Sequence, residues 1–74
     1  MSGINEVKAR ISAAKDQVEF YNAVEDVCIC GGFRFDDRET MKENSERAAL
    51  AGRPLISEAL RFAGVVVKRN GWSE

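Results

Sequence analysis

The 74-residue sequence has no histidine, one proline and two cysteines, and its formal net charge is only −1. Without histidine, the chain lacks the usual general base of nucleophilic catalysis and the commonest nitrogen ligand for metals. A net charge near zero provides no overall basic field that would attract nucleic acid or acidic lipids. No apolar run approaches the ~18 residues that a membrane span requires. We therefore expect neither an enzyme, nor a cofactor, nor a membrane protein.

The composition is that of a small globular protein, with 45% hydrophobic and 31% charged residues. Residues 1–74 predict a single small helical domain, and a domain of this size buries only about 60% of its unfolded surface. Two cysteines are too few for a disulfide-stapled secreted domain, and the first residues lack the basic and apolar regions of a signal peptide. The sequence therefore predicts a cytoplasmic protein with reduced thiols.

Apolar residues recur at intervals of three and four over the first third of the chain. The positions are Ile4, Val7, Ile11, Ala14, Val18 and Tyr21, followed by Glu25 and Cys28. This spacing is typical of one face of an amphipathic helix, and no proline or glycine interrupts it after Gly3. The pattern predicts one long N-terminal helix that ends near residue 27.

Two further helices are expected, both packed on the first. Asp36 and Glu39 resemble a helix-capping pair, so the second helix should start near Asp36 or Asp37 and end at Gly52. An acidic row then faces either solvent or a basic edge of the first helix; the row is Glu39, Glu43 and Glu46, and the edge is Lys8, Arg10 and Lys15. The third helix starts at Pro54 and is apolar on most sides, which predicts that it is buried.

Two segments leave open whether the fold is mainly α or α+β. Residues 27–36 carry short alternating runs around Gly31 and Gly32, which predicts a hairpin or else a loop that sends Phe33 and Phe35 into the core. Residues 65–67 are three valines after Gly64, which fit either a continued helix or a short C-terminal strand. Trp72 follows a turn signal, and we expect it to fold back onto the core.

Cys28 and Cys30 are the weak candidates for a metal or redox site. Zinc takes four ligands, and one chain has no histidine and no second cysteine pair to complete such a set. A dimer would supply four thiolates. The alternative, which we favour, is that both cysteines are small apolar residues of the packing. The Gly31–Gly32 pair lacks the later glycines and lysine of a phosphate-binding loop, and we interpret it as a turn.

The segment from Phe33 to Lys68 resembles the ribbon–helix–helix family of DNA-binding proteins. The matching pieces are Phe33-Arg34-Phe35, Gly52-Arg53 and Ser57-Glu58-Ala59-Leu60-Arg61. The resemblance covers about half the chain and implies a dimeric DNA-binding regulator. The residues that would contact nucleic acid in this alternative are Arg34, Arg53, Arg61, Lys68 and Arg69.

The function that we favour from the sequence is a small, non-enzymatic regulatory or binding protein. It would act through protein–protein contacts on the long amphipathic helix, with another protein or a second copy of itself as the partner. Four residues of that helix are the candidate partner-binding site, because exposed apolar patches mark contact surfaces; they are Phe20, Tyr21, Val24 and Val27. Accessory proteins of bacteria and their phages are often of this kind.

Overall fold

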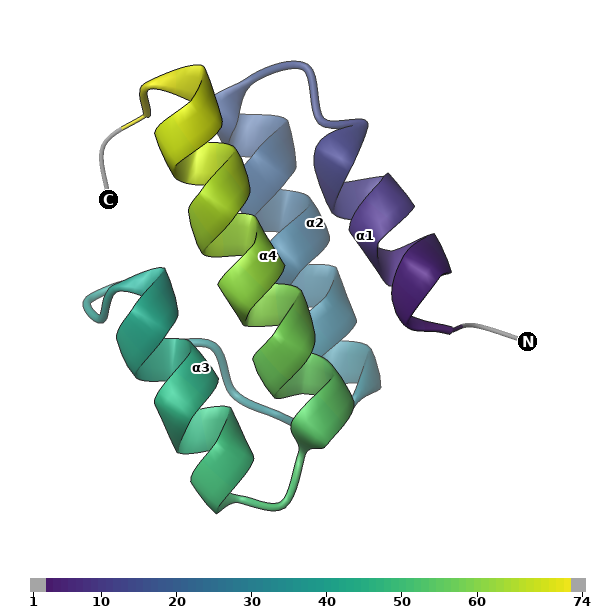
Figure 1. Cartoon of the computed structure of the whole chain (residues 1–74), viewed down its shortest axis with the longest axis vertical. Helices are drawn as coiled ribbons and strands as arrows, with labels where there is room; N and C mark the ends of the chain where they lie inside the picture. The colour runs from purple at the N-terminus through teal and green to yellow at the C-terminus, as the bar shows by residue number, and fades with distance from the viewer. Residues whose placement is uncertain (1–2, 73–74) are drawn as a thin grey trace.

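The computed structural model of the chain describes residues 3–72, and it contains four helices. They are α1 (Ile4–Ser12), α2 (Gln17–Cys30), α3 (Met41–Leu50) and α4 (Pro54–Asn70). The longest helix, α4, lies at the centre, with α1 and α3 on its two sides and α2 behind it (Figure 1). No strand occurs in residues 3–72, so the fold is all-α and the α+β alternative is wrong.

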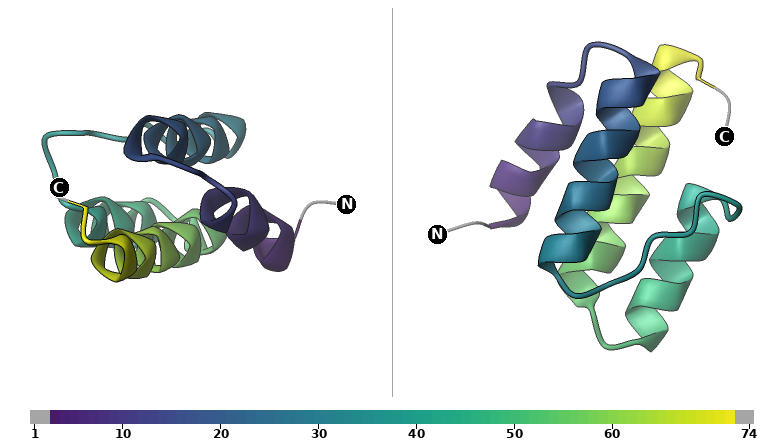
Figure 2. Two further views of the ribbon diagram at one scale, coloured as in Figure 1. Left: turned by 90° about the horizontal axis from the view of Figure 1, so that it is seen from above. Right: turned by 180° about the vertical axis from the view of Figure 1, so that it is seen from behind.

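The prediction of one long N-terminal helix is wrong, because the chain turns back on itself at residues 13–16. Asp16 adopts an extended conformation (φ −142°), and its carboxylate accepts a hydrogen bond from the Glu19 backbone N–H at 2.9 Å. This cap starts α2 in a new direction, antiparallel to α1 (Figure 2). A helix of 24 residues would be about 36 Å long, whereas the longest dimension of the molecule is 30 Å.

The turn also changes which residues of α2 face the core. Val18 belonged to the predicted apolar face, yet it is 72% exposed. The buried face of α2 instead consists of Phe20, Val24, Val27 and Cys28. The predicted apolar face is therefore buried in α1, through Val7 and Ile11, whereas α2 buries a different set of residues.

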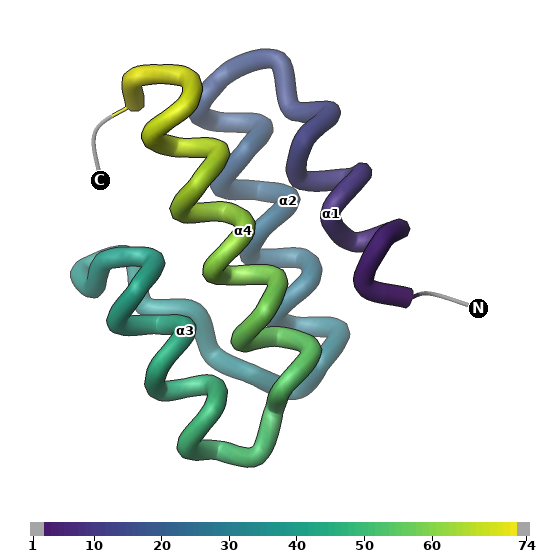
Figure 3. The backbone as a smooth tube through the Cα atoms, viewed as in Figure 1, coloured from purple at the N-terminus to yellow at the C-terminus, as the bar shows by residue number. Residues whose placement is uncertain are grey.

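The predicted hairpin at residues 27–36 is also wrong, and the loop alternative is confirmed. Gly32 has a φ of 71°, and its N–H donates to the Ile29 carbonyl while the Phe33 N–H donates to the Cys28 carbonyl. These are the hydrogen bonds of a helix C-terminus in which glycine takes the left-handed conformation. The chain then runs as a loop from the end of α2 to the start of α3 (Figure 3). Phe33 is buried within that loop and Phe35 is half-buried.

The start of α3 lies later than predicted. Thr40 caps the helix by accepting from the Glu43 N–H at 3.1 Å, and the Glu43 carboxylate accepts from the Thr40 N–H at 2.9 Å. Asp36 is instead part of the preceding loop. The predicted end at Gly52 is confirmed, because the Gly52 and Arg53 N–H groups donate to the Ala49 and Ala48 carbonyls.

Pro54 is the first residue of α4, as predicted, and the helix continues through residues 65–67 to Asn70. The predicted C-terminal strand is therefore wrong. Gly64 does not interrupt the helix, and its α-carbon lies so close to α3 that an added Cβ would be 3.5 Å from the Met41 Cβ. Helix packing outweighs the strand preference of the valines here.

The prediction that both later helices pack on the first is correct only for α4. Within residues 3–72, α3 contacts α4 and does not contact α1, whereas α1 packs on α4 and α2. The proposed pairing of the acidic row with the first helix does not form. Lys8 pairs with Glu58 of α4 at 3.2 Å, Arg10 lies 3.8 Å from Asp26, and Glu39 pairs with Arg47 at 3.1 Å.

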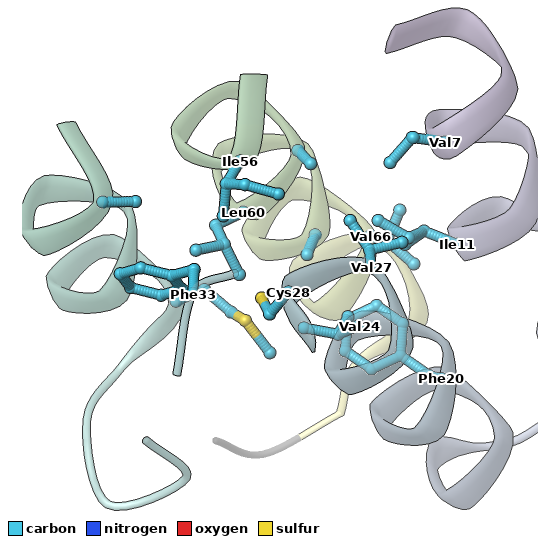
Figure 4. Close-up of a cluster of buried hydrophobic side chains, with 14 of the residues drawn as sticks. Val7, Ile11, Phe20, Val24, Val27, Cys28, Phe33, Ile56, Leu60 and Val66 are labelled. Carbon is cyan, nitrogen blue, oxygen red and sulfur yellow. The ribbon is translucent and has the colours of Figure 1, made fainter. Parts of the chain in front are cut away.

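The core lies between α2 and α4 and is closed by α1 on one side and by α3 with Phe33 on the other (Figure 4). Trp72 folds back as predicted, with its ring 5.2 Å from the ring of Phe20. The described helices include none long and apolar enough to cross a bilayer.

Candidate functional site

The predicted partner-binding residues do not form an exposed apolar patch. Phe20 is 0% exposed, Val24 and Val27 are also buried, and only Tyr21 remains half-buried. The sequence pattern placed Phe20, Val24 and Val27 beside the main apolar face of a long helix, and Tyr21 on that face. In the structure Phe20, Val24 and Val27 lie in the core, where the Phe20 ring packs against Trp72. Of the four residues, only Tyr21 keeps part of its side chain accessible to a partner.

A groove between α3 and α4 brings together two of the predicted cationic residues. Arg61 and Lys68 of α4 line it with Lys42 of α3, and its volume is about 190 Å³. Arg61 and Lys68 lie seven residues apart on one face of the helix. None of the three cations forms an ion pair within the described residues 3–72. We call this feature the basic groove.

The basic groove has an apolar centre. Val65 lies between the two α4 cations and is 57% exposed, while Leu60 and Met41 form a buried floor. Gly64 also lines the groove and adds no side chain to fill it. A neighbouring hollow continues along Lys42 and Arg61 to Glu46, so one carboxylate borders the cations.

Further cations flank the same outer face of α4. Arg69 donates to the Ser12 hydroxyl at 3.4 Å, which ties the last turn of α4 to α1. Lys8 of α1 pairs with Glu58, and its ammonium lies 5.7 Å from the centre of the Phe62 ring. The outer face of α4 is therefore bordered by positive charge from α1 and from α3.

The remaining two predicted cations lie away from the basic groove. Arg34 is in the loop between α2 and α3, where its backbone carbonyl accepts from Arg47 at 2.8 Å. Arg53 precedes the first residue of α4, whereas Lys68 is in the last turn of that 17-residue helix. The five cations therefore do not form one surface.

The ribbon of the ribbon–helix–helix resemblance does not form in this chain. Residues 33–35 are part of a loop, and residues 3–72 contain no strand that a second chain could pair with. The family resemblance is therefore wrong at the level of the fold.

The two cysteines face different environments. Cys28 is buried, and that burial raises the pKa of its thiol to about 11, so the thiolate that binds metals is disfavoured. Cys30 is exposed. The described part of the chain contains no cluster of three or more residues able to hold a metal ion. A thiolate site shared between two chains would require Cys28 to leave the core.

A polar network that the sequence did not indicate holds the loop of residues 31–40 against α3. Asn44 is fully buried; its side-chain oxygen accepts from the Asp36 N–H at 2.9 Å, and its amide nitrogen donates to the Asp36 carbonyl at 2.8 Å. Arg47 donates to Asn44 at 2.9 Å and lies 4.6 Å from the centre of the Phe33 ring. The loop is therefore fixed at both its backbone and its buried aromatic residue.

The exposed part of that loop carries its own ion pair. Arg38 donates to the Asp36 carboxylate from its side chain and its backbone, and these hydrogen bonds lower the pKa of Asp36 below its ordinary value. Asp36 is thereby engaged within the loop on both its backbone and its side chain.

Comparison with known proteins assigns no family. No protein-family model matches the chain, and no curated protein or solved structure is significantly similar to it.

Proposed function

We propose that this chain is a small, non-enzymatic binding protein that docks an acidic segment of another protein in the basic groove. The proposal moves the contact surface from the first helix, where the sequence placed it, to the outer face of α4. The observation that supports it is the arrangement, around an exposed valine, of three cations that form no ion pair within residues 3–72.

The chemistry of the groove favours a protein partner over a nucleic acid. Val65 offers an apolar contact at the centre, and the cations at its rim would select for carboxylates and speed the encounter. Protein interfaces combine an apolar centre with a polar rim in this way. Nucleic-acid surfaces instead present a continuous row of phosphates, whereas the cations of the basic groove surround an apolar side chain and do not form a continuous row.

The test compares two charge-reversal variants of equal charge change. Arg61→Glu with Lys68→Glu reverses the basic groove, and Arg34→Glu with Arg53→Glu reverses two exposed cations outside it. The wild type and each variant are immobilised and used to recover binding proteins. The recovered partner is then purified, and its affinity for the wild type and for each variant is measured. We expect the groove variant to lose at least about tenfold in affinity, equivalent to about 1.4 kcal/mol, while the control variant binds like the wild type.

Circular dichroism checks that both variants remain folded. A partner that binds the groove variant as tightly as the wild type would contradict the proposal. A duplex DNA titration at low salt is the second arm. Binding of DNA that the groove variant loses, with a steep dependence on salt, would assign the groove to nucleic acid instead.

A further inference from the structure

A second cleft lies on a different side of the molecule, between α2 and the loop of residues 31–40. It is lined by Tyr21, Glu25, Phe35 and Asp37, and its volume is about 220 Å³. When the molecule is seen from behind, α2 is in front of α4 and this loop runs beside it (Figure 2). We call this feature the aromatic cleft.

Two aromatic rings form the walls of the aromatic cleft. The rings of Tyr21 and Phe35 are 6.2 Å apart between centres and are inclined at 49°. Tyr21 also packs edge-on against the buried ring of Phe20, at 5.3 Å. Phe35 precedes Asp36, whose backbone N–H and carbonyl are both hydrogen-bonded to the Asn44 side chain. Both rings are therefore held in place before any ligand binds, which lowers the entropic cost of binding.

Two carboxylates complete the lining. Glu25 and Asp37 are exposed, and neither forms an ion pair with a cation anywhere in residues 3–72. The neighbouring Asp36 is paired with Arg38 at 3.2 Å, and Asp37 interacts with the charge of Arg38 only at longer range. The faces of aromatic rings and free carboxylates both attract cations. A cleft that combines them is complementary to an ammonium or guanidinium group.

We propose that the aromatic cleft binds a lysine or arginine side chain of a partner polypeptide. The aliphatic part of such a side chain would pack between the rings, and its charge would reach Glu25 and Asp37. This site is opposite in charge to the basic groove and is formed by other elements, so it is a binding site beyond the proposed function.

The surface around the cleft favours a polypeptide over a small free cation. Val18 and Ile29 of α2 are each 72% exposed, and they lie on one face of the helix about 16 Å apart. Glu25 lies between them on the same face, and α2 contains three acidic residues and no basic one. A basic segment with apolar residues would contact this whole face, whereas a single small cation would reach only the cleft.

The proposal is tested by nuclear magnetic resonance titration of the ¹⁵N-labelled full chain with three probes. The first is an acetylated and amidated peptide that alternates lysine and leucine. The second is the same peptide with norleucine in place of lysine, and the third is N-acetyl-lysine N-methylamide. We expect the lysine peptide to give saturable shifts at Tyr21, Glu25, Phe35 and Asp37. We expect the norleucine peptide to give none there, and the single lysine derivative to bind at least tenfold more weakly than the lysine peptide.

Matched variants separate the cleft from the overall negative charge. Glu25→Gln with Asp37→Asn removes the two cleft carboxylates and should weaken the lysine peptide by tenfold or more. Glu6→Gln with Glu46→Gln removes the same charge from exposed positions elsewhere and should leave its affinity unchanged. Equal binding of the norleucine peptide, or equal weakening in both variants, would overturn the proposal. A single lysine derivative that binds as tightly as the peptide would overturn the assignment to a polypeptide.

Discussion

At the residue scale, buried polar side chains decide how α3 is placed. Ser45 donates from its hydroxyl to the Ser57 carbonyl at 2.9 Å, and both serines are buried where α3 meets α4. Asn44 is 0% exposed and joins α3 to the loop that precedes it. Small polar residues that satisfy one another in this way let the two helices approach closely without leaving an unpaired buried group.

The side chain of Asn44 is bound to the loop through the Asp36 backbone, and this leads to a stability prediction. Asn44→Ala would remove the hydrogen bonds that the buried Asn44 side chain makes with the half-buried Asp36 backbone and with Arg47. Each such hydrogen bond contributes ~0.5–1.5 kcal/mol, so we expect the free energy of unfolding to fall by about 2–3 kcal/mol. Urea denaturation followed by circular dichroism measures the change.

Asn22→Ala is the matched control, because Asn22 is an exposed asparagine of α2. Surface substitutions away from special features change stability by less than about 0.5 kcal/mol. If the two variants unfolded at the same urea concentration, the hydrogen bonds of Asn44 would contribute nothing net to the loop.

The sequence did not indicate these residues, and the reason is physical. Residues 41–47 are mostly polar, and a polar residue in a helical pattern is normally expected at the surface. Burial of Asn44 depends on the loop that covers it, and that contact spans eight positions of the chain. The candidate site depends on the same packing. Lys42, which no pattern singled out, joins Arg61 and Lys68 only because α3 lies on α4.

At the scale of the element, local chemistry predicted the junction of α3 and α4 well, but predicted the start of α3 and the continuity of the first helix poorly. Gly52 and Pro54 were placed correctly because each has a conformational preference of its own. Gly31 and Gly32 suit either a hairpin turn or a helix C-terminus, so the pair alone did not distinguish the two. The apolar spacing from Ile4 to Cys28 suggested one helix because Val18 continues the period of Ile11, although α2 buries a face that begins at Phe20 and leaves Val18 exposed.

The turn before α2 had one signal in the sequence, which is the spacing of Asp16 and Glu19. An aspartate followed three residues later by a glutamate is typical of a helix start. Asp16→Ala gives a test in which the two interpretations predict opposite signs. In the structure the substitution removes the cap of α2 and should lower the free energy of unfolding by about 1 kcal/mol. In one continuous helix, alanine would be the better helix former and would raise it.

Thermal unfolding of the Asp16→Ala variant distinguishes these outcomes. Asp26→Ala is the control, because Asp26 forms only an exposed ion pair of 3.8 Å with Arg10, and such pairs contribute little. A higher melting temperature for Asp16→Ala than for the wild type would mean that α1 and α2 are continuous in solution.

At the scale of the whole molecule, a net charge of −1 conceals two surfaces of opposite sign. The basic groove is formed by α3 and α4, whereas α2, which contains three acidic residues and no basic one, lies behind α4 (Figure 1). The sequence showed the excess of positive charge near its C-terminal end, but the arrangement of the surfaces depends on the topology. The predicted pairing of the acidic row with the first helix does not determine that topology. Glu39 lies in the loop before α3 and pairs with Arg47 of α3 instead.

Two complementary surfaces on one chain raise the question of self-association, and the structure predicts a monomer. A stable interface buries at least about 1,200 Å² in total and has an apolar centre. The exposed large apolar residues are instead divided among three helices; they are Val18 and Ile29 of α2, Leu50 of α3, and Leu55 and Val65 of α4. Attraction between a basic groove and an acidic face alone is weak and screened at physiological salt.

Light scattering at micromolar concentration, in low and in high salt, measures the solution mass. We expect the mass of one chain at physiological salt and above, with any association at low salt abolished by Arg61→Glu with Lys68→Glu. A dimer that persists in high salt would contradict the prediction, because salt screens exposed charge pairs but does not weaken an interface of buried apolar surface. Dissociation of such a dimer by Val65→Asp, but not by Val18→Asp, would place the contact in the basic groove. The groove would then be occupied by a second copy of the chain rather than by a different protein.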